Sequence, residues 1–258
     1  MPDARRKAFQ QINRYFDAVY VLTLERATDR QAAFREAFDG LDYQFFFGAD
    51  KTQFHIPDLI QAGIYSEQLA IKNHRYSRPM SPGQIGCSWS HRQIYEQILA
   101  RNQQRVLILE DDSIPQDDAL SCVDQILQAF PADWELVLLD YYKNEKRSWF
   151  RQAVYHINRT LGLLKWNHRM IRNLFPQPVN TYISKAGFHH YTNAYAITAA
   201  GAAKLIQLQT PIAYVADHVI PYAITNELMR GYICHPKLFQ QTSTGADATI
   251  ESFVGDGK

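Results

Sequence analysis

Four apolar residues, Val106 to Leu109, are followed directly by the three carboxylates Glu110, Asp111 and Asp112. The apolar run predicts a strand that is buried on both faces of a sheet in an α/β protein. Because side chains alternate along a strand, Glu110 and Asp112 are expected on one side and Asp111 on the other. Two like charges about 4 Å apart repel by roughly 4 kcal/mol at an effective dielectric constant near 20, and a cation would relieve this repulsion. The functional interpretation of this pattern is a divalent metal site that holds a phosphorylated substrate at the carboxyl end of the strand.

The acidic tripeptide has a second interpretation, a solvated turn in which Asp112 or Ser113 caps a helix that begins near Gln116. The residues upstream favour the first interpretation. Residues 81–91 contain Gly-x-x-Gly-Cys-x-x-Ser-His, and a helical pattern separates this segment from Leu-Glu-Asp-Asp. The composite pattern resembles glycosyltransferase family 25, which includes lipopolysaccharide and lipooligosaccharide galactosyltransferases and their collagen galactosyltransferase relatives.

Segments on both sides of this composite also resemble the family, in the same order. An apolar strand over residues 18–24 ends at Leu24 and is followed by Arg26 and by Asp-Arg at residues 29–30, with Thr23 where the family has Asn. A second strand, at residues 43–47, precedes Asp50. The resemblance implies that Leu24, Arg26, Arg30 and Asp50 lie near a nucleotide, as do Ser90 and His91 of the composite segment. For the arginines the alternative is a surface ion pair with Glu25 or Asp29.

The second half of the chain carries three further matches. A strand at residues 192–198 follows His190-Tyr191, where the family often has an aromatic residue and Gly, so the acceptor side is expected to differ. Residues 214–221 resemble the family's Pro-Val-Asp before a helix, which implies a catalytic base at Asp217; the alternatives are a helix cap at Asp217 and a base at His218. The tail at 236–241 resembles Pro-x-Leu-x-x-Gln and is expected to fold over the donor, and Ala248-Thr249-Ile250 stands for a later Ser-x-Ile.

The resemblance implies an α/β fold of the GT-A type, with a mostly parallel central sheet flanked by helices, over one domain at 1–258. It implies an inverting, metal-dependent transfer of a hexose, with UDP-galactose as donor and a saccharide or glycolipid of lipopolysaccharide or lipooligosaccharide as acceptor. Glu110 and Asp112 are the expected ligands of Mn²⁺ or Mg²⁺. Asp111 is expected to bind the ribose or the sugar of the donor, and Asp217 to take the proton from the acceptor hydroxyl. His235 is a candidate third metal ligand.

Residues 141–190 differ from the remainder in charge. They contain nine Lys or Arg and one acid, a net charge of +8, whereas the remainder has 18 basic and 25 acidic residues, a net charge of −7. Apolar residues at helical spacing from Val154 to Phe175 predict a basic amphipathic helical insertion. The segment is a candidate for contact with an anionic membrane or acceptor, and the alternative is a helix that packs its apolar stripe on its own domain.

The overall composition limits the class of protein. The net charge of +1 does not indicate a nucleic-acid partner. Cys87, Cys122 and Cys234 are odd in number and far apart, which favours a reducing compartment without a disulfide framework. The amino-terminal segment does not have the apolar run of a signal peptide, so a cytoplasmic location is expected, peripheral on the inner membrane face if the basic insertion binds lipid. The sequence does not specify the oligomeric state.

Two other functions fit parts of the pattern. A catalytically silent relative would keep the fold as a binding or assembly protein at the membrane. A glycoside hydrolase would use paired carboxylates without a metal or nucleotide.

Overall fold

The computed structural model describes residues 2–74 and 77–242. Within these ranges, one large sheet consists of β1 (Ala18–Thr23), β2 (Gln44–Phe47), β3 (Arg105–Glu110), β5 (Leu136–Leu138), β6 (Gln177–Pro178), β7 (Ile183–Lys185), β8 (Ala194–Thr198) and β9 (Gly231–Cys234). Its strand order is β2-β1-β3-β8-β5-β9-β7-β6. Of these strands, β7 and β8 run opposite to the other six. The α/β class with mostly like-directed strands is therefore confirmed, as a mixed sheet.

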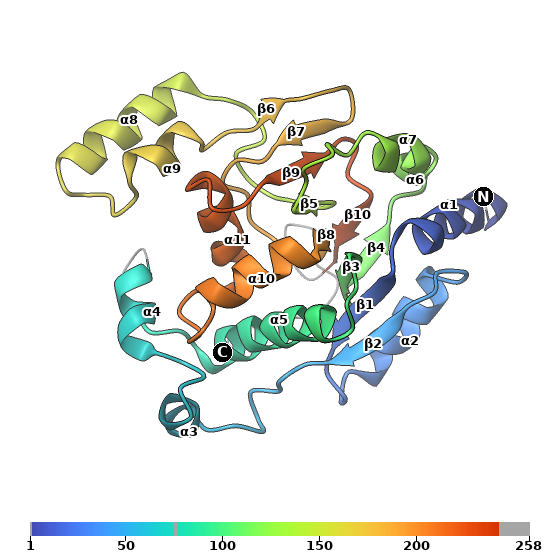
Figure 1. Ribbon diagram of the computed structural model, residues 1–258, viewed down its shortest axis with the longest axis horizontal. Helices are drawn as coiled ribbons and strands as arrows, with labels where there is room; N and C mark the ends of the chain where they lie inside the picture. The colour runs from blue at the N-terminus through green and yellow to red at the C-terminus, as the bar shows by residue number, and fades with distance from the viewer. Residues whose placement is uncertain (1, 75–76, 243–258) are drawn as a thin grey trace.

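Helices cover both faces of the sheet (Figure 1). One face packs against α1 (Pro2–Tyr15), α2 (Thr28–Ala37), α6 (Asp117–Leu120) and α7 (Val123–Gln128), and the other against α5 (Pro82–Ala100), α10 (Ala199–Leu208) and α11 (Ala216–Thr225). In β3, Leu107 and Leu109 face the first layer, whereas Val106 and Ile108 face the second. The apolar run is buried on both sides, as predicted, because alternate residues enter separate cores.

The rim of the sheet brings the acidic residues together with two other strands. Leu22 in β1 is the partner of Glu110 in a parallel ladder, and Leu109 is the partner of Ala194 in the antiparallel ladder with β8. The carboxyl ends of β1 and β3 therefore meet the amino end of β8. Beyond this rim, β4 (Ser113–Pro115) pairs with β10 (Phe239–Gln241).

The solvated-turn interpretation of the tripeptide is wrong. Asp111 and Asp112 are only 7% and 4% exposed. The next helix, α6, begins at Asp117 with Gln116 in the N-cap position, so neither Asp112 nor Ser113 caps it. The two aspartates lie in a turn after the end of β3. The strict alternation expected of an extended strand consequently stops at Glu110.

Helix α5 begins beside the same rim because its amino terminus is strongly specified. Ser81 and Gln84 form a reciprocal capping box, and Pro82 occupies the first turn, where its missing N–H costs nothing. Gly86 lets the helix approach the segment after β2, since a Cβ at this position would lie 2.6 Å from the carbonyl oxygen of Ala49. Two short helices, α3 (Ile56–Gln61) and α4 (Glu67–Asn73), pack with Ile85 in a smaller cluster.

Residues 141–190 form two helices, α8 (Trp149–Thr160) and α9 (His168–Arg172), before β6 and β7 extend the sheet. The predicted continuous amphipathic stripe is wrong, because the chain turns between the two helices. Ile157 and Leu161 are exposed, whereas Leu164, Ile171 and Phe175 are buried. Among the described residues, none of the helices combines the length and the apolar character needed to cross a bilayer.

Candidate active site

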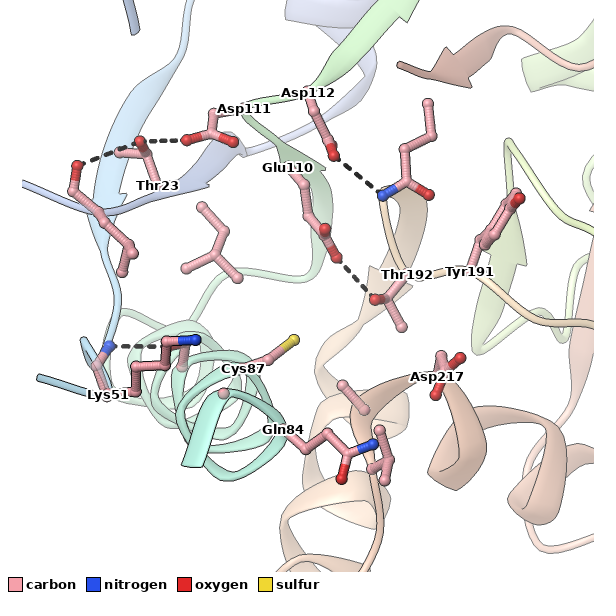
Figure 2. A pocket seen from close by; sticks show the side chains of 18 of the residues that line it. Thr23, Lys51, Gln84, Cys87, Glu110, Asp111, Asp112, Tyr191, Thr192 and Asp217 are labelled. Carbon is pink, nitrogen blue, oxygen red and sulfur yellow. Dashed lines mark hydrogen bonds between the residues drawn. The ribbon is translucent and has the colours of Figure 1, made fainter. Parts of the chain in front are cut away.

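A cavity of about 350 Å³ lies at the rim where β1 and β3 end and β8 begins (Figure 2). Helices α5 and α11 supply its other walls. It is lined by Leu22, Thr23, Leu24, Arg26, Arg30, Ala49, Lys51, His74, Gly83, Gln84, Cys87, Ser90, Glu110, Asp111, Asp112, Tyr191, Thr192, Val215, Ala216, Asp217, His218 and Gln241. Eight of the ten side chains predicted for the site belong to this set, and the exceptions are Asp50 and His91.

Arg30 joins two of the three carboxylates. Its Nη1 lies 3.1 Å from Oδ1 of Asp111 and its Nη2 lies 3.0 Å from Oδ2 of Asp112, and the arginine side chain is only 10% exposed. Arg30 lines the cavity, and its ion-pair partners are Asp111 and Asp112 rather than Glu25 or Asp29. The Arg30 guanidinium therefore offsets part of the negative charge of the acidic rim.

Asp111 points away from the cavity centre toward β1 (Figure 2). Its Oδ2 accepts a 2.6 Å hydrogen bond from the hydroxyl of Thr23. Burial raises the pKa of Asp111 to about 6, although the Arg30 guanidinium and the Thr23 hydroxyl act in the opposite direction. Thr23, where the family has Asn, thus keeps a polar contact with the acidic rim.

Glu110 lies on the opposite side of the rim and is held by two donors. Thr192 Oγ1 donates to Glu110 Oε1 at 2.7 Å, and His91 Nε2 lies 3.4 Å from the same oxygen. Burial opposes ionisation of Glu110, but the contacts with His91 and Thr192 outweigh it and lower the pKa of the carboxyl. His91 is buried, and its Nδ1 lies 2.8 Å from the Tyr195 hydroxyl. His91 thus lies outside the cavity lining and contacts the site through Glu110, and its contact with a cofactor stays a prediction.

The remaining predicted nucleotide residues lie along the β1–α5 side. Arg26 lines the cavity and forms an ion pair with Asp50, which itself lies outside the cavity wall. Ser90 accepts a hydrogen bond from the Ala49 N–H at 2.8 Å and donates to the Gly86 carbonyl at 2.7 Å. Its hydroxyl thus connects α5 to the segment after β2. Leu24 lines the cavity as predicted.

The donor set at the rim fits a hard divalent cation. Glu110 and Asp112 both line the cavity and offer carboxylate oxygens, the ligands that Mg²⁺ and Mn²⁺ prefer. One or two protein carboxylates, with water and substrate phosphates, form the usual magnesium site in phosphate chemistry. Asp112 also has partners other than the expected metal. It forms an ion pair with Arg30, which pairs with Asp111 as well, and it accepts a 3.0 Å hydrogen bond from Gln241 Nε2.

Two groups of three potential ligand atoms within 4.8 Å occur among the described residues: Cys87, His91 and Glu110, and His190, Asp217 and His218. In the first group, burial raises the pKa of the Cys87 thiol well above its usual value, so the thiolate that binds metals is disfavoured. Cys87 is a free thiol, as are Cys122 and Cys234.

Asp217 lies in the first turn of α11, across the cavity from the acidic rim (Figure 2). The helix-cap interpretation is wrong, because Val215 occupies the N-cap position. His190 Nδ1 lies 3.5 Å from Asp217 Oδ2 and His218 Nε2 lies 3.9 Å from Asp217 Oδ1. Burial opposes ionisation of Asp217, but the two histidines outweigh it and lower its pKa. The geometry admits a base at Asp217 or at His218, since both line the cavity.

Sequence reasoning assigned no role to Thr192 or Lys51, which line the cavity. Gln241 ends the quoted tail motif, and the pairing of β10 with β4 brings it beside Asp112. His235 bonds to the Tyr141 hydroxyl and lies 3.2 Å from the Ser184 hydroxyl, outside the cavity lining, so its assignment as a third metal ligand is wrong. Residues 248–250 lie outside the described part of the chain.

Comparison with known proteins gives a consistent result. The family model described as "Glycosyltransferase family 25 (LPS biosynthesis protein)" matches residues 16–220. A glycosyltransferase 25 family member from Anopheles gambiae is 27% identical over 230 residues, which cover 84% of this chain and 33% of the relative. Human procollagen galactosyltransferase 2 is 24% identical over 198 residues, covering 74% and 27%. Human inactive glycosyltransferase 25 family member 3 is 26% identical over 197 residues, covering 75% and 29%. The chain thus spans about a third of the length of these relatives.

Proposed function

Because the chain belongs to glycosyltransferase family 25, we propose that it transfers a hexose from a nucleotide-sugar donor to a hydroxyl group of a saccharide acceptor. The proposed donor is UDP-galactose, since one of the relatives reported above is named procollagen galactosyltransferase 2. The proposed acceptor is a glycan of lipopolysaccharide, lipooligosaccharide or another surface glycan. The observation that carries the proposal is one cavity with the acidic rim on one wall and Asp217 on the other.

On this proposal Glu110 and Asp112 hold Mn²⁺ or Mg²⁺. When bound, the ion supplies Lewis-acid stabilisation of the diphosphate leaving group, an effect worth several kcal/mol in metalloenzymes. Thr192 and His91 keep the Glu110 carboxylate oriented and ionised. Arg30 adds a fixed positive charge at the same rim, where negative charge on the diphosphate would collect. Asp111 is assigned to the donor's ribose or sugar.

The acceptor side of the proposed reaction belongs to Asp217. Its carboxylate takes the proton of the acceptor hydroxyl while that oxygen attacks the anomeric carbon, and the bond to the nucleoside diphosphate breaks with inversion. Such a base typically contributes about 10²–10⁴-fold in rate. The lowered pKa of Asp217 keeps it unprotonated near neutral pH, and His190 and His218 fix its position.

A thermal-shift panel of UDP-sugars, with and without Mn²⁺, tests donor and metal together, because a ligand of the native state raises the melting temperature. UDP-galactose with Mn²⁺ is expected to give the largest shift. Replacing Glu110→Gln and Asp112→Asn together should abolish the Mn²⁺-dependent part and the transfer activity. Asp118→Asn, at an exposed position on α6, is the matched control. Unchanged Mn²⁺-supported donor binding and turnover in the double variant would refute the proposal.

A binding protein without turnover is the second candidate, favoured by the relative that is named inactive. It predicts a thermal shift with UDP-sugars but no release of UDP with any saccharide acceptor. The retained acidic rim and Asp217 favour the enzyme. A glycoside hydrolase is not proposed, because the family consists of transferases; activity that survives removal of divalent metal by EDTA would reopen it.

A further inference from the structure

Helix α8 exposes its apolar side to solvent. Phe150, Ile157 and Leu161 are 81%, 58% and 66% exposed. At 3.6 residues per turn these three positions fall on one side of the helix. Trp149, the first residue of the helix, and Leu163, three residues beyond its last, are 69% and 75% exposed. These five residues are called the α8 patch. Exposed large apolar residues that gather on one face mark an interaction site.

The inward side of α8 is polar, which is the reverse of an ordinary surface helix. Gln152 is buried, and its Nε2 donates to the carbonyl oxygens of Ile171 at 2.8 Å and Arg172 at 3.0 Å. Tyr155 packs edge-on against Trp166, with ring centroids 5.6 Å apart. Figure 1 shows α8 at the outer edge of the molecule, with α9 beneath it. Because Gln152 and Tyr155 make these contacts on the inner side of α8, the apolar side of the helix faces solvent.

The positive charge around the α8 patch favours one kind of binding partner over another. Residues 141–190 carry a net charge of +8. Arg147, Arg151 and Lys165 are exposed near the ends of α8, and the Arg147 guanidinium lies 3.6 Å from the centre of the Trp149 ring. A second copy docked symmetrically on this face would bring an equal positive charge against it, which disfavours a dimer. An anionic lipid surface offers apolar chains beneath negative headgroups and matches both features.

We propose that the α8 patch docks on an anionic lipid bilayer, with Phe150, Ile157 and Leu161 below the headgroups and the flanking basic residues among them. This orientation is that of an amphipathic helix lying in the plane of the interface. Arg159, within α8, is partly buried, so the cations assigned to the headgroups are the exposed ones near the ends of α8.

Packed rings connect α8 to the acceptor side of the cavity. Trp166 lies 4.7 Å from Phe188, and Phe188 lies 5.5 Å from His190, measured between ring centroids. His190 in turn contacts Asp217. If the proposed transferase function holds, a docked enzyme carries its catalytic base on the part of the fold that is anchored to lipid, which suits a glycolipid acceptor. The docking itself does not depend on that function.

Co-sedimentation of the full chain with vesicles tests the docking without an activity readout. Vesicles of phosphatidylglycerol and phosphatidylcholine should bind the chain at least tenfold more tightly than phosphatidylcholine alone, and 0.5 M salt should weaken binding at least fivefold. The double variant F150D/I157D should lose at least tenfold in binding to the anionic vesicles. Ile60→Asp, 44% exposed on α3, is the matched control and should bind as the unmodified chain does.

Equal binding to neutral and anionic vesicles, or salt-insensitive binding of the unmodified chain, would overturn the assignment of an anionic surface even if a variant failed to fold. Unchanged binding of a folded F150D/I157D variant would overturn the role of the α8 patch. Sedimentation velocity provides a separate check. If the unmodified chain is a dimer and F150D/I157D is a monomer, the partner of the α8 patch is a second copy of the chain, and the lipid proposal is overturned.

Discussion

Loss of the Arg30 charge should destabilise the fold strongly and in a metal-dependent way. Arg30 contacts Asp111 and Asp112 at 3.1 and 3.0 Å, and all three side chains are at most 10% exposed. Removing one partner of a buried ion pair costs about 3–5 kcal/mol, because the other charge is left uncompensated. Arg30→Gln should therefore lower the free energy of unfolding by about 3–5 kcal/mol. At about 2–4 °C per kcal/mol for a chain near this size, the melting temperature should fall by roughly 6–20 °C.

The metal should recover part of this loss, since a cation at Glu110 and Asp112 would replace the missing charge. Mn²⁺ at about 100 times its dissociation constant stabilises a protein by about 2.7 kcal/mol. Urea denaturation of Arg30→Gln with and without Mn²⁺ measures both quantities. The Mn²⁺-induced gain should be larger in the variant than in the unmodified chain, because Arg30 no longer competes for Asp112.

Arg26→Gln is the matched control. Arg26 also pairs with an aspartate, Asp50, but its side chain is 46% exposed, so the loss should stay below about 1 kcal/mol. Equal destabilisation by the two substitutions would refute the reasoning about the buried pair. An Arg30→Gln variant that Mn²⁺ stabilises no more than the unmodified chain would refute the assignment of the cation to this rim.

Three further predictions concern other residues. Asp217→Asn should lower kcat about 10²–10⁴-fold while leaving the donor-induced thermal shift unchanged, and a tenfold or smaller loss would transfer the role of base to His218. Burial lowers the pKa of His189 to about 4. The protein should therefore become less stable as pH falls from about 6.5 to 4, because the histidine of the unfolded chain is protonated first. The free energy of unfolding should fall by about 3 kcal/mol over this pH range because of His189. In His189→Gln it should depend less on pH by that amount, and an identical pH slope in the variant would contradict the lowered pKa of His189. Gly86→Ala should destabilise by about 1–3 kcal/mol, since the Cβ would meet the Ala49 carbonyl, and an unchanged melting temperature would count against that contact.

Local pattern was sufficient to predict the central strand and its acids. Four consecutive apolar residues from Val106 are stable as a strand only where both faces are covered, and three carboxylates must then mark its end. The mostly parallel sheet that was expected also agrees with β3 and β5 running in the same direction, since both are antiparallel to β8. The local pattern did not predict that β8 lies between them, because hydrogen-bond partners distant in the chain leave no local signal.

Details of the site required the folded structure. The contacts of Arg30 with Asp111 and of Thr192 with Glu110 join residues more than 80 positions apart, and no periodicity records them. Helical spacing identified the apolar positions of α8 but not the direction in which they face. That direction depends on Gln152 and Tyr155 finding partners on α9 and beside it, which is a tertiary property.

The hydrogen bond from Asn193 Nδ2 to Asp140 Oδ2, at 3.0 Å, joins the two ends of the segment between β5 and β8, which contains α8, α9, β6 and β7. Two buried polar side chains therefore hold the ends of this segment together, while β1 and β3, which end at the acidic rim, come from earlier in the chain. A change in the length or charge of the segment between Asp140 and Asn193 therefore need not shift the register of β1 and β3, because that register depends on a ladder formed elsewhere in the chain. The acidic rim and the outer segment can thus vary independently of each other in sequence.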